Sequence, residues 1–152
     1  MDAANSIERL TLSIENFNSL FIRLPSSGRL NFSALSVLHT LSRVGTCRLS
    51  DLVKTEQIKQ PALTSAVAKL ERDGLIERTP DPCDRRASML SLTAEGRALV
   101  SRRHADRVER LRSLIDRLPP ADRTRLLGIA GVLDRIVQLS DEQDNNVEGS
   151  EP

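Results

Sequence analysis

The sequence is poor in aromatic residues, cysteines and histidines. Its 152 residues include three phenylalanines, no tyrosine, no tryptophan, two cysteines and two histidines. Because it lacks an aromatic platform on which bases could stack, single-stranded nucleic acid is a poor candidate partner. Two cysteines do not form a disulfide framework. Neither histidine has a cysteine or carboxylate at ligand spacing, which argues against a zinc site.

Motifs for catalysis and for membrane insertion are missing as well. The sequence contains no nucleophile elbow, phosphate-binding loop or acid/base pair, so we expect neither enzymatic activity nor a cofactor. No apolar run approaches the roughly 20 residues of a membrane span. The opening segment MDAANSIERL has neither the basic nor the apolar region of a signal peptide. We therefore expect a cytoplasmic protein.

The net charge of +1 conceals an uneven distribution. Residues 141–152 contain five acidic and no basic side chains, so the preceding residues contain 22 basic and 16 acidic side chains, a net charge of +6. A moderately basic body is compatible with binding to nucleic acid. The acidic tail, residues 141–152, is nearly free of apolar residues, so we expect it to be disordered.

Residues 48–93 contain two short helical patterns followed by a hairpin. The second helix is predicted from about Gln60 to Asp73, because Pro61 is tolerated in a first helical turn and Gly74 ends the pattern. Its apolar residues recur at i, i+4 and i+7 and form one face: Leu63, Val67 and Leu70. The opposite face is small, polar and exposed, which suits close approach to a partner.

The segment after this helix changes to strand-forming residues. LIERT and ASMLSLT are separated by PDPCDRR, whose prolines and aspartates predict a hairpin with a basic tip. Helix, turn, helix and hairpin in this order predict a winged helix-turn-helix. In that arrangement the second helix enters the major groove and the wing contacts the DNA backbone or minor groove.

Longer helical patterns flank this segment on both sides. Apolar residues spaced by three and four predict a helix over residues 3–24, and Asn31 is a suitable N-cap for another over residues 32–44. Thr93 is a suitable N-cap for a helix to about Leu118, after which Pro119 and Pro120 begin the last helix. The fold class expected is therefore mainly α with a small β-hairpin wing.

The wing sequence resembles that of a known family. Asp84-Arg85-Arg86-Ala87, followed by Leu90-Ser91-Leu92-Thr93 and Gly96, resembles the MarR family (multiple antibiotic resistance regulators), dimeric bacterial winged-helix transcription factors. The resemblance covers nearly the whole chain. It implies one domain over residues 1–140, with the DNA-binding lobe at 31–96 and dimerisation helices at 1–30 and 97–140.

The predicted DNA contacts follow from side-chain chemistry and from this resemblance. Basic side chains suit phosphates and short polar side chains suit base edges. The predicted set is Lys59, Gln60, Pro61, Thr64, Ser65, Lys69, Arg72, Asp84, Arg85 and Arg86. The resemblance implies that Arg86 enters the minor groove while Asp84 steadies it; a surface ion pair is the alternative. Many family members have Arg or Lys where this chain has Ser65, which weakens any inference about base preference.

The dimer interface is implied by the resemblance, with packing inside one chain as the alternative for the first helix. The predicted interface residues are Ile7, Leu10, Ile14, Phe17, Leu111, Ile115 and Leu133. His104 interrupts an apolar seam, either as an interface histidine or as a ligand contact. Cys83, beside the wing arginines, is either an ordinary surface thiol or a redox sensor.

The function expected is sequence-specific binding to double-stranded DNA. The resemblance implies a homodimeric repressor that binds a pseudo-palindromic operator. It also implies that a small-molecule effector, bound between the dimer helices and the DNA-binding lobe, releases the protein from DNA. The sequence does not locate the effector pocket. The alternative is a winged-helix module that binds a protein partner instead of DNA.

Overall fold

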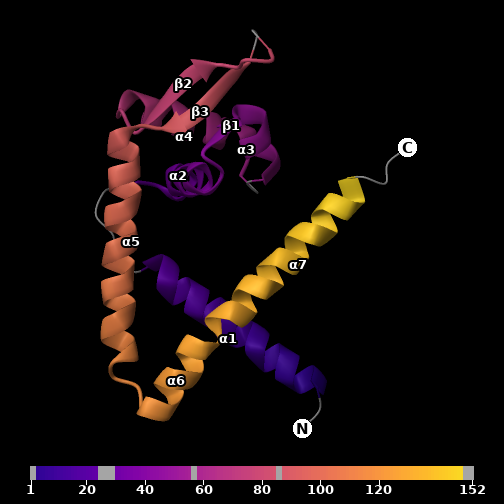
Figure 1. The fold of residues 1–152 in the computed structure, drawn as a ribbon, viewed down its shortest axis with the longest axis vertical. Coiled ribbons are helices and arrows are strands. Elements are labelled where there is room, and N and C mark those ends of the chain that lie inside the picture. Colours follow the sequence, from indigo (N-terminus) through magenta and orange to yellow (C-terminus); the bar gives the residue numbers. More distant parts are fainter. Residues whose placement is uncertain (1–2, 24–29, 56–57, 85–86, 149–152) are drawn as a thin grey trace. The chain divides into compact units, whose positions relative to one another are not determined.

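The computed structural model describes residues 3–23, 30–55, 58–84 and 87–148. The chain divides into two compact units, residues 1–108 and 109–152. The elements, labelled in Figure 1, are α1 (Ala3–Arg23), α2 (Phe32–Val44), β1 (Thr46–Arg48), α3 (Leu49–Thr55), α4 (Gln60–Arg72), β2 (Ile76–Pro80), β3 (Ser88–Leu92), α5 (Ala94–Ile115), α6 (Pro120–Gly128) and α7 (Ala130–Glu148). The structure is mostly helical, as the sequence predicts.

The hairpin predicted from the sequence is present and is extended by a third strand. The sheet has the order β1-β3-β2, and both pairings are antiparallel. Leu90 in the central strand lies opposite Cys47 on one side and Arg78 on the other. The sheet, α3 and α4 together form the predicted winged helix-turn-helix (Figure 1).

A single apolar cluster holds this lobe together. Its members come from α2, α3, α4, β2 and β3: Ala34, Val37, Leu38, Leu41, Leu52, Leu63, Ala66, Val67, Leu70, Ile76, Leu90 and Leu92. Helix α2 packs against both α4 and the sheet, because its buried residues recur every three to four positions along one face. The cluster therefore fixes α4 and the wing hairpin on the same core.

Side-chain caps and a glycine set the ends of the helices. Asn31 Oδ1 accepts a 2.9 Å hydrogen bond from the Ala34 amide, as predicted for an N-cap. The Thr93 hydroxyl accepts from the Gly96 amide and donates to the Gly74 carbonyl, so it joins the start of α5 to the turn after α4. Gly74 has a φ of 70°, a conformation that other residues rarely adopt.

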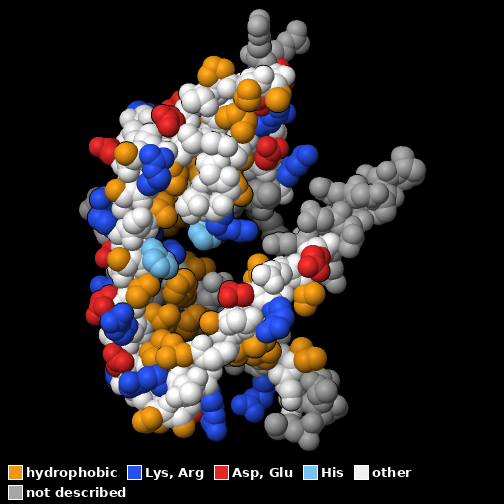
Figure 2. Space-filling model, in the orientation of Figure 1, with side chains coloured by type: hydrophobic (Ala, Val, Ile, Leu, Met, Phe, Trp, Pro, Cys, Tyr) orange, Lys and Arg blue, Asp and Glu red, His pale blue; other side chains and the backbone are white. Residues whose placement is uncertain are grey.

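Helix α1 exposes its apolar residues. The exposed fractions of Ile7, Leu10, Ile14 and Phe17 are 67%, 49%, 47% and 46%. Figure 2 shows exposed apolar side chains, in orange, on the face of the molecule that is turned toward the viewer. No helix among the described residues is both long and apolar enough to cross a membrane.

The C-terminal unit differs from the sequence expectation in two ways. The single last helix expected after Pro120 is divided into α6 and α7, with a break at Ile129. Helix α7 runs to Glu148 and so includes the backbone of residues 141–148, whereas the sequence expectation is disorder from residue 141. No glycine or proline interrupts the chain between Gly131 and Gly149, so nothing in the sequence stops the helix earlier. Residues 149–152 lie outside the described residues.

Candidate nucleic-acid interface and effector cavity

Helix α4 has the two faces that a recognition helix needs. Leu63, Val67 and Leu70 are fully buried, as predicted, and Ala66 is buried with them. The opposite face is exposed and consists of small or polar residues: Gln60, Pro61, Thr64, Ser65 and Ala68. Polar side chains on a helix that is held by its apolar face are free to approach base edges in a groove.

The polar residues at the start of α4 differ in their hydrogen bonding. The Thr64 hydroxyl donates to the Gln60 carbonyl over 2.9 Å, so its proton is used within the helix and its oxygen lone pairs remain available as acceptors. Lys59 occupies the N-cap position, is exposed, and makes no side-chain capping bond. Arg72 at the other end is exposed and Lys69 is half-buried. The predicted helix residues thus lie on one element, with the basic ones toward both of its ends.

The wing is the hairpin of β2 and β3, and its tip is the turn between them. The Ala87 amide donates to the Asp84 carbonyl over 2.9 Å, which closes the tip. Asp84 and Cys83 are exposed. Arg85 and Arg86 lie outside the described residues, so the pairing of Asp84 with Arg86 stays a prediction.

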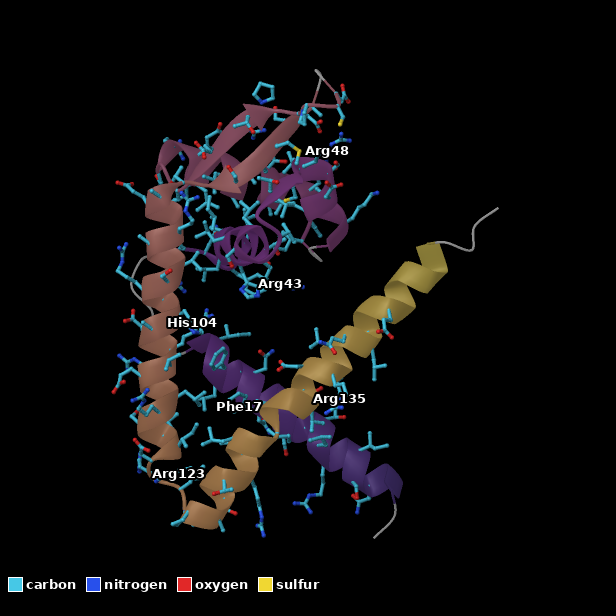
Figure 3. All side chains as sticks on the ribbon, viewed as in Figure 1. Phe17, Arg43, Arg48, His104, Arg123 and Arg135 are labelled. Atoms are coloured by element: carbon cyan, nitrogen blue, oxygen red, sulfur yellow. The ribbon has the colours of Figure 1, made fainter. Side chains whose placement is uncertain are left out.

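An aspartate that the sequence reasoning missed fixes the base of this turn. The side chain of Asp81 is only 3% exposed, and its Oδ2 accepts from Arg48 Nε over 2.6 Å (Figure 3 labels Arg48). Its Oδ1 accepts from the amides of Cys83 and Asp84 over 2.7 and 3.2 Å. The Arg48 hydrogen bond, then the Cys83 amide, lower the pKa of Asp81, and the same bond raises the pKa of Arg48. The signal was the Asp81-Pro82 step, since aspartate in a turn accepts from amides two residues on.

A second ion pair ties the wing to the recognition helix. Arg78 Nε in β2 lies 3.0 Å from Glu71 Oε2 near the end of α4. Their side chains are 35% and 40% exposed, so the pair contributes only about 0–1 kcal/mol to stability.

A cavity of about 410 Å³ lies between α2 and α5 within the first unit. Leu35, Leu38 and Val100 supply its apolar wall, and its polar lining comprises His39, Ser42, Ser101, Arg103, His104 and Arg107. Figure 3 labels His104, on α5. Cavities with an apolar wall and a few polar groups are the usual form of small-molecule sites. His104, which the sequence leaves between an interface role and a ligand role, lines this cavity.

One buried and one half-buried arginine give the cavity a cationic character. Arg103 is 7% exposed, and burial, followed by the charge of nearby Arg107, lowers its pKa. The Arg107 guanidinium lies 5.4 Å from the centre of the Phe21 ring. Its Nε is buried and has no hydrogen-bond partner within the described part of the chain. A buried donor in this state favours an acceptor supplied from outside the chain, and an anion would also relieve the Arg103–Arg107 repulsion.

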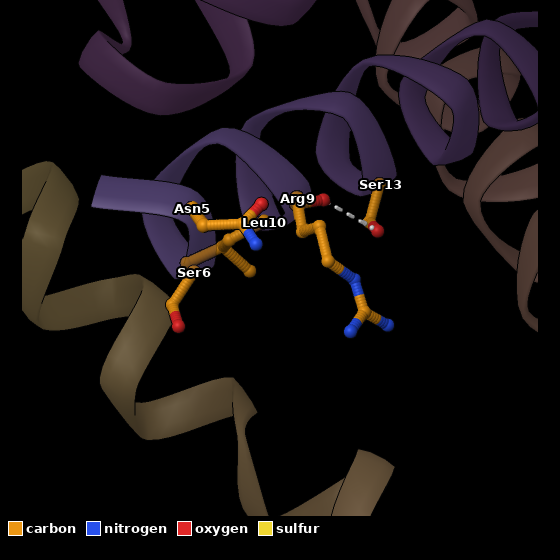
Figure 4. A pocket seen from close by; sticks show the side chains of 5 residues that line it. All are labelled: Asn5, Ser6, Arg9, Leu10 and Ser13. Carbon is orange, nitrogen blue, oxygen red and sulfur yellow. Dashed lines mark hydrogen bonds between the residues drawn. The ribbon is translucent and has the colours of Figure 1, made fainter. Parts of the chain in front are cut away.

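Two further surface pockets are less suited to a ligand than the cavity between α2 and α5. One, of about 310 Å³, runs along the exposed side of α1 and is lined by that helix alone: Asn5, Ser6, Arg9, Leu10 and Ser13 (Figure 4). The other adjoins the cavity and is lined by the end of α2, the sheet and α5. Within the described residues no three His, Cys, Asp or Glu side chains are grouped as metal ligands would be.

Comparison with known proteins agrees with this geometry. The model of the MarR family matches residues 30–88. The HTH-type transcriptional regulator Mb0904 of Mycobacterium bovis is 32% identical over 123 residues, 81% of this chain and 83% of the relative. The solved structure of a transcriptional regulator protein from Pseudomonas aeruginosa superposes with a TM-score of 0.73, over 89% of this chain and 96% of that chain. The two sequences are 27% identical.

A further structural relative is associated with a ligand. BpsR of Bordetella bronchiseptica, whose DNA binding is regulated by 6-hydroxynicotinic acid, is 25% identical with a TM-score of 0.56, over 85% of this chain and 98% of that chain. The family match and the relative of 32% identity confirm the resemblance seen in the wing sequence. The chain belongs to the MarR family of winged helix-turn-helix transcriptional regulators.

Proposed function

We propose that this regulator is a homodimeric repressor that binds a pseudo-palindromic DNA operator in the bacterial cytoplasm and is released by a small anionic ligand. The observation that supports this most strongly is the division of α4 into a buried apolar face and an exposed polar face. Because the same core holds the wing hairpin, one lobe offers both a helix for the major groove and a wing for the adjacent backbone. The DNA-contact set is the one predicted from the sequence.

The homodimer is supported by apolar side chains that one chain leaves uncovered. Ile7, Leu10, Ile14 and Phe17 of α1 are all about half-exposed or more, and Leu133 of α7 is 42% exposed. Rows of exposed apolar residues at helical spacing mark association surfaces. Leu111 and Ile115, at the end of α5, are half-buried and complete the proposed interface set. In a dimer the two recognition helices would meet successive major grooves, about 34–36 Å apart.

The effector site that we propose is the cavity between α2 and α5. Its apolar wall and paired guanidinium groups suit a small molecule with an apolar body and a carboxylate or phenolate. BpsR, which responds to a hydroxylated aromatic acid, supports this ligand class. Helix α2 contributes to the apolar core on which the recognition helix packs, and α5 directly follows β3, the second strand of the wing. A ligand that binds one arrangement of the two helices more tightly would shift the population toward it.

The experiment that tests the DNA-binding role compares Arg86→Ala with Arg135→Ala. Both variants lose one arginine charge, but Arg135 lies on α7, outside the predicted DNA contacts. We expect Arg86→Ala to weaken binding to the protein's preferred duplex about tenfold or more, since hydrogen bonds to charged groups contribute about 1.5–3 kcal/mol. Arg135→Ala should bind like the wild type. Equal affinity of both variants in a mobility shift would remove the wing from the interface.

A further inference from the structure

Arg48 and Asp81 join two parts of the lobe that are distant in the sequence. Arg48 is the last residue of β1, immediately before α3, and Asp81 follows the last residue of β2. Since β3 lies between these strands, the 2.6 Å hydrogen bond from Arg48 Nε to Asp81 Oδ2 links the two outer strands of the sheet. The carboxylate side is almost fully buried, whereas the arginine side is 40% exposed.

Asp81 also controls the backbone of the turn that follows it. Its Oδ1 accepts from the amides of Cys83 and Asp84, and its own amide donates to the Ala87 carbonyl over 3.2 Å. One carboxylate therefore binds the arginine of β1 through one oxygen and two turn amides through the other. Hydrogen bonds to an ionised group are about twice as strong as those between neutral groups.

We propose that Arg48 and Asp81 are positioning residues for DNA binding. Together they fix the first residues of the wing turn relative to β1 and α3, so that the wing and the recognition helix meet a duplex as one rigid surface. This inference rests on the proposed function. Without the pair, the backbone of Cys83 and Asp84 would have to become ordered on binding, at a cost of about tenfold in affinity per residue.

The variant Asp81→Asn separates positioning from simple electrostatics. It removes a negative charge close to the proposed DNA surface, so charge alone predicts tighter binding to phosphates. If Asp81 acts by positioning the wing turn, its replacement should instead weaken binding. We expect affinity for a duplex selected by the wild type to fall about tenfold to a hundredfold. We also expect the salt dependence to become shallower by at least one phosphate contact, a change of about 0.9 in log–log slope.

Matched controls use an exposed ion pair outside the lobe. Asp122→Asn and Arg125→Gln make the same charge changes in α6, where the two side chains lie 3.4 Å apart. Both should leave affinity within about twofold of the wild type, since all of the proposed DNA contacts belong to the lobe. As a single substitution, Arg48→Gln should weaken DNA binding. Added to Asp81→Asn, it should have little further effect, because the two residues act through one bond.

Affinity is measured at a temperature well below the melting temperature of every variant, where a purely structural role leaves it unchanged. If Asp81→Asn does not fold, Arg48→Lys provides the test, since it keeps the charge but loses the planar Nε donor. Weaker binding with a shallower salt slope supports the inference. Wild-type affinity and slope in the folded variant overturn it, while the proposed function stands. If the wild type itself selects no duplex, the proposed function fails, and the inference fails with it.

Discussion

A side chain at Gly96 would overlap the carbonyl oxygen of Leu75, the residue that leads into β2. The same carbonyl accepts a 3.1 Å hydrogen bond from the Thr93 amide, so the first turn of α5 lies directly against the backbone at the start of the wing. The glycine in this position, one of the residues on which the family resemblance is based, therefore has a steric cause.

The close approach at Gly96 predicts a loss of stability on adding one methyl group. Gly96→Ala should lower the free energy of unfolding by about 1–3 kcal/mol, because a backbone carbonyl must move to make room. Gly131→Ala is the control, since nothing lies within 4 Å of its added Cβ and it is within α7. This variant should gain about 0.5–1 kcal/mol from helix propensity. Thermal melting of both variants checks the pair, and equal shifts would contradict the packing account.

Asp81 should make stability depend on pH in the acid range. Its pKa in the folded chain is lowered, so the folded state favours the ionised carboxylate. The resulting stabilisation is complete above the unfolded value of about 3.9 and disappears as the pH falls below it toward the folded value. Melting curves of the wild type and Asp81→Asn should therefore differ most at neutral pH and converge below about pH 4. A constant difference down to pH 3 would count against an ionised Asp81 in the native fold.

Two neighbouring residues at the start of α4, the N-cap Lys59 and the first helical residue Gln60, should have different effects on DNA binding. Gln60→Ala should relax the preference for one base pair in each half-site by about 1–3 kcal/mol, because an amide reads base edges. Lys59→Ala should weaken binding to all sequences alike and reduce the salt slope by about 0.9. Binding assays on a panel of single-base operator variants distinguish the two. A uniform loss for Gln60→Ala would remove it from the set of base-reading residues.

The exposed apolar face of α1 predicts a charge-sensitive dimer. Ile14→Glu should shift the protein to monomer at micromolar concentration, because an unpaired buried carboxylate costs several kcal/mol. Asn16→Glu introduces the same charge at a polar, exposed position of the same helix and should leave the dimer intact. Sedimentation analysis gives the masses. A dimer that persists in Ile14→Glu would place the interface elsewhere.

The cavity between α2 and α5 predicts binding of small aromatic carboxylates. Arg107→Met keeps an unbranched apolar side chain but removes the guanidinium, so affinity for these ligands should fall about tenfold or more. Arg43→Met, at an exposed position on α2 that does not line the cavity, is the matched control. Calorimetry with a series of hydroxybenzoates and hydroxynicotinates measures the effect. Ligands that bind both variants equally would show that the anion site lies outside this cavity.

The sequence predicted the parts of the fold that depend on local patterns. The buried face of α4, the caps at Asn31 and Thr93, and the wing hairpin follow from spacing and from single residues with strong local preferences. The composition of the tail did not indicate that α7 continues through residues 141–148, because polar residues without glycine or proline can extend a helix.

The sequence could not predict contacts that require the tertiary structure. Arg48 and Asp81 are 33 residues apart, and their bond depends on the strand order. The effector cavity depends on α2 facing α5, which brings His39 beside residues such as Arg103 and Arg107. An arginine on a helix is ordinarily expected in solvent, so nothing in the sequence marks Arg103 as buried.

The most direct test of the central claim is selection of bound duplexes from a random DNA library by the full-length protein. A homodimer with two recognition helices should enrich an inverted repeat whose half-site centres are about 10–10.5 base pairs apart. Inserting five base pairs between the half-sites should abolish high-affinity binding, because the two lobes would then face opposite sides of the helix. Selection of no duplex, or of a single half-site with no dependence on spacing, would contradict a homodimeric DNA-binding regulator.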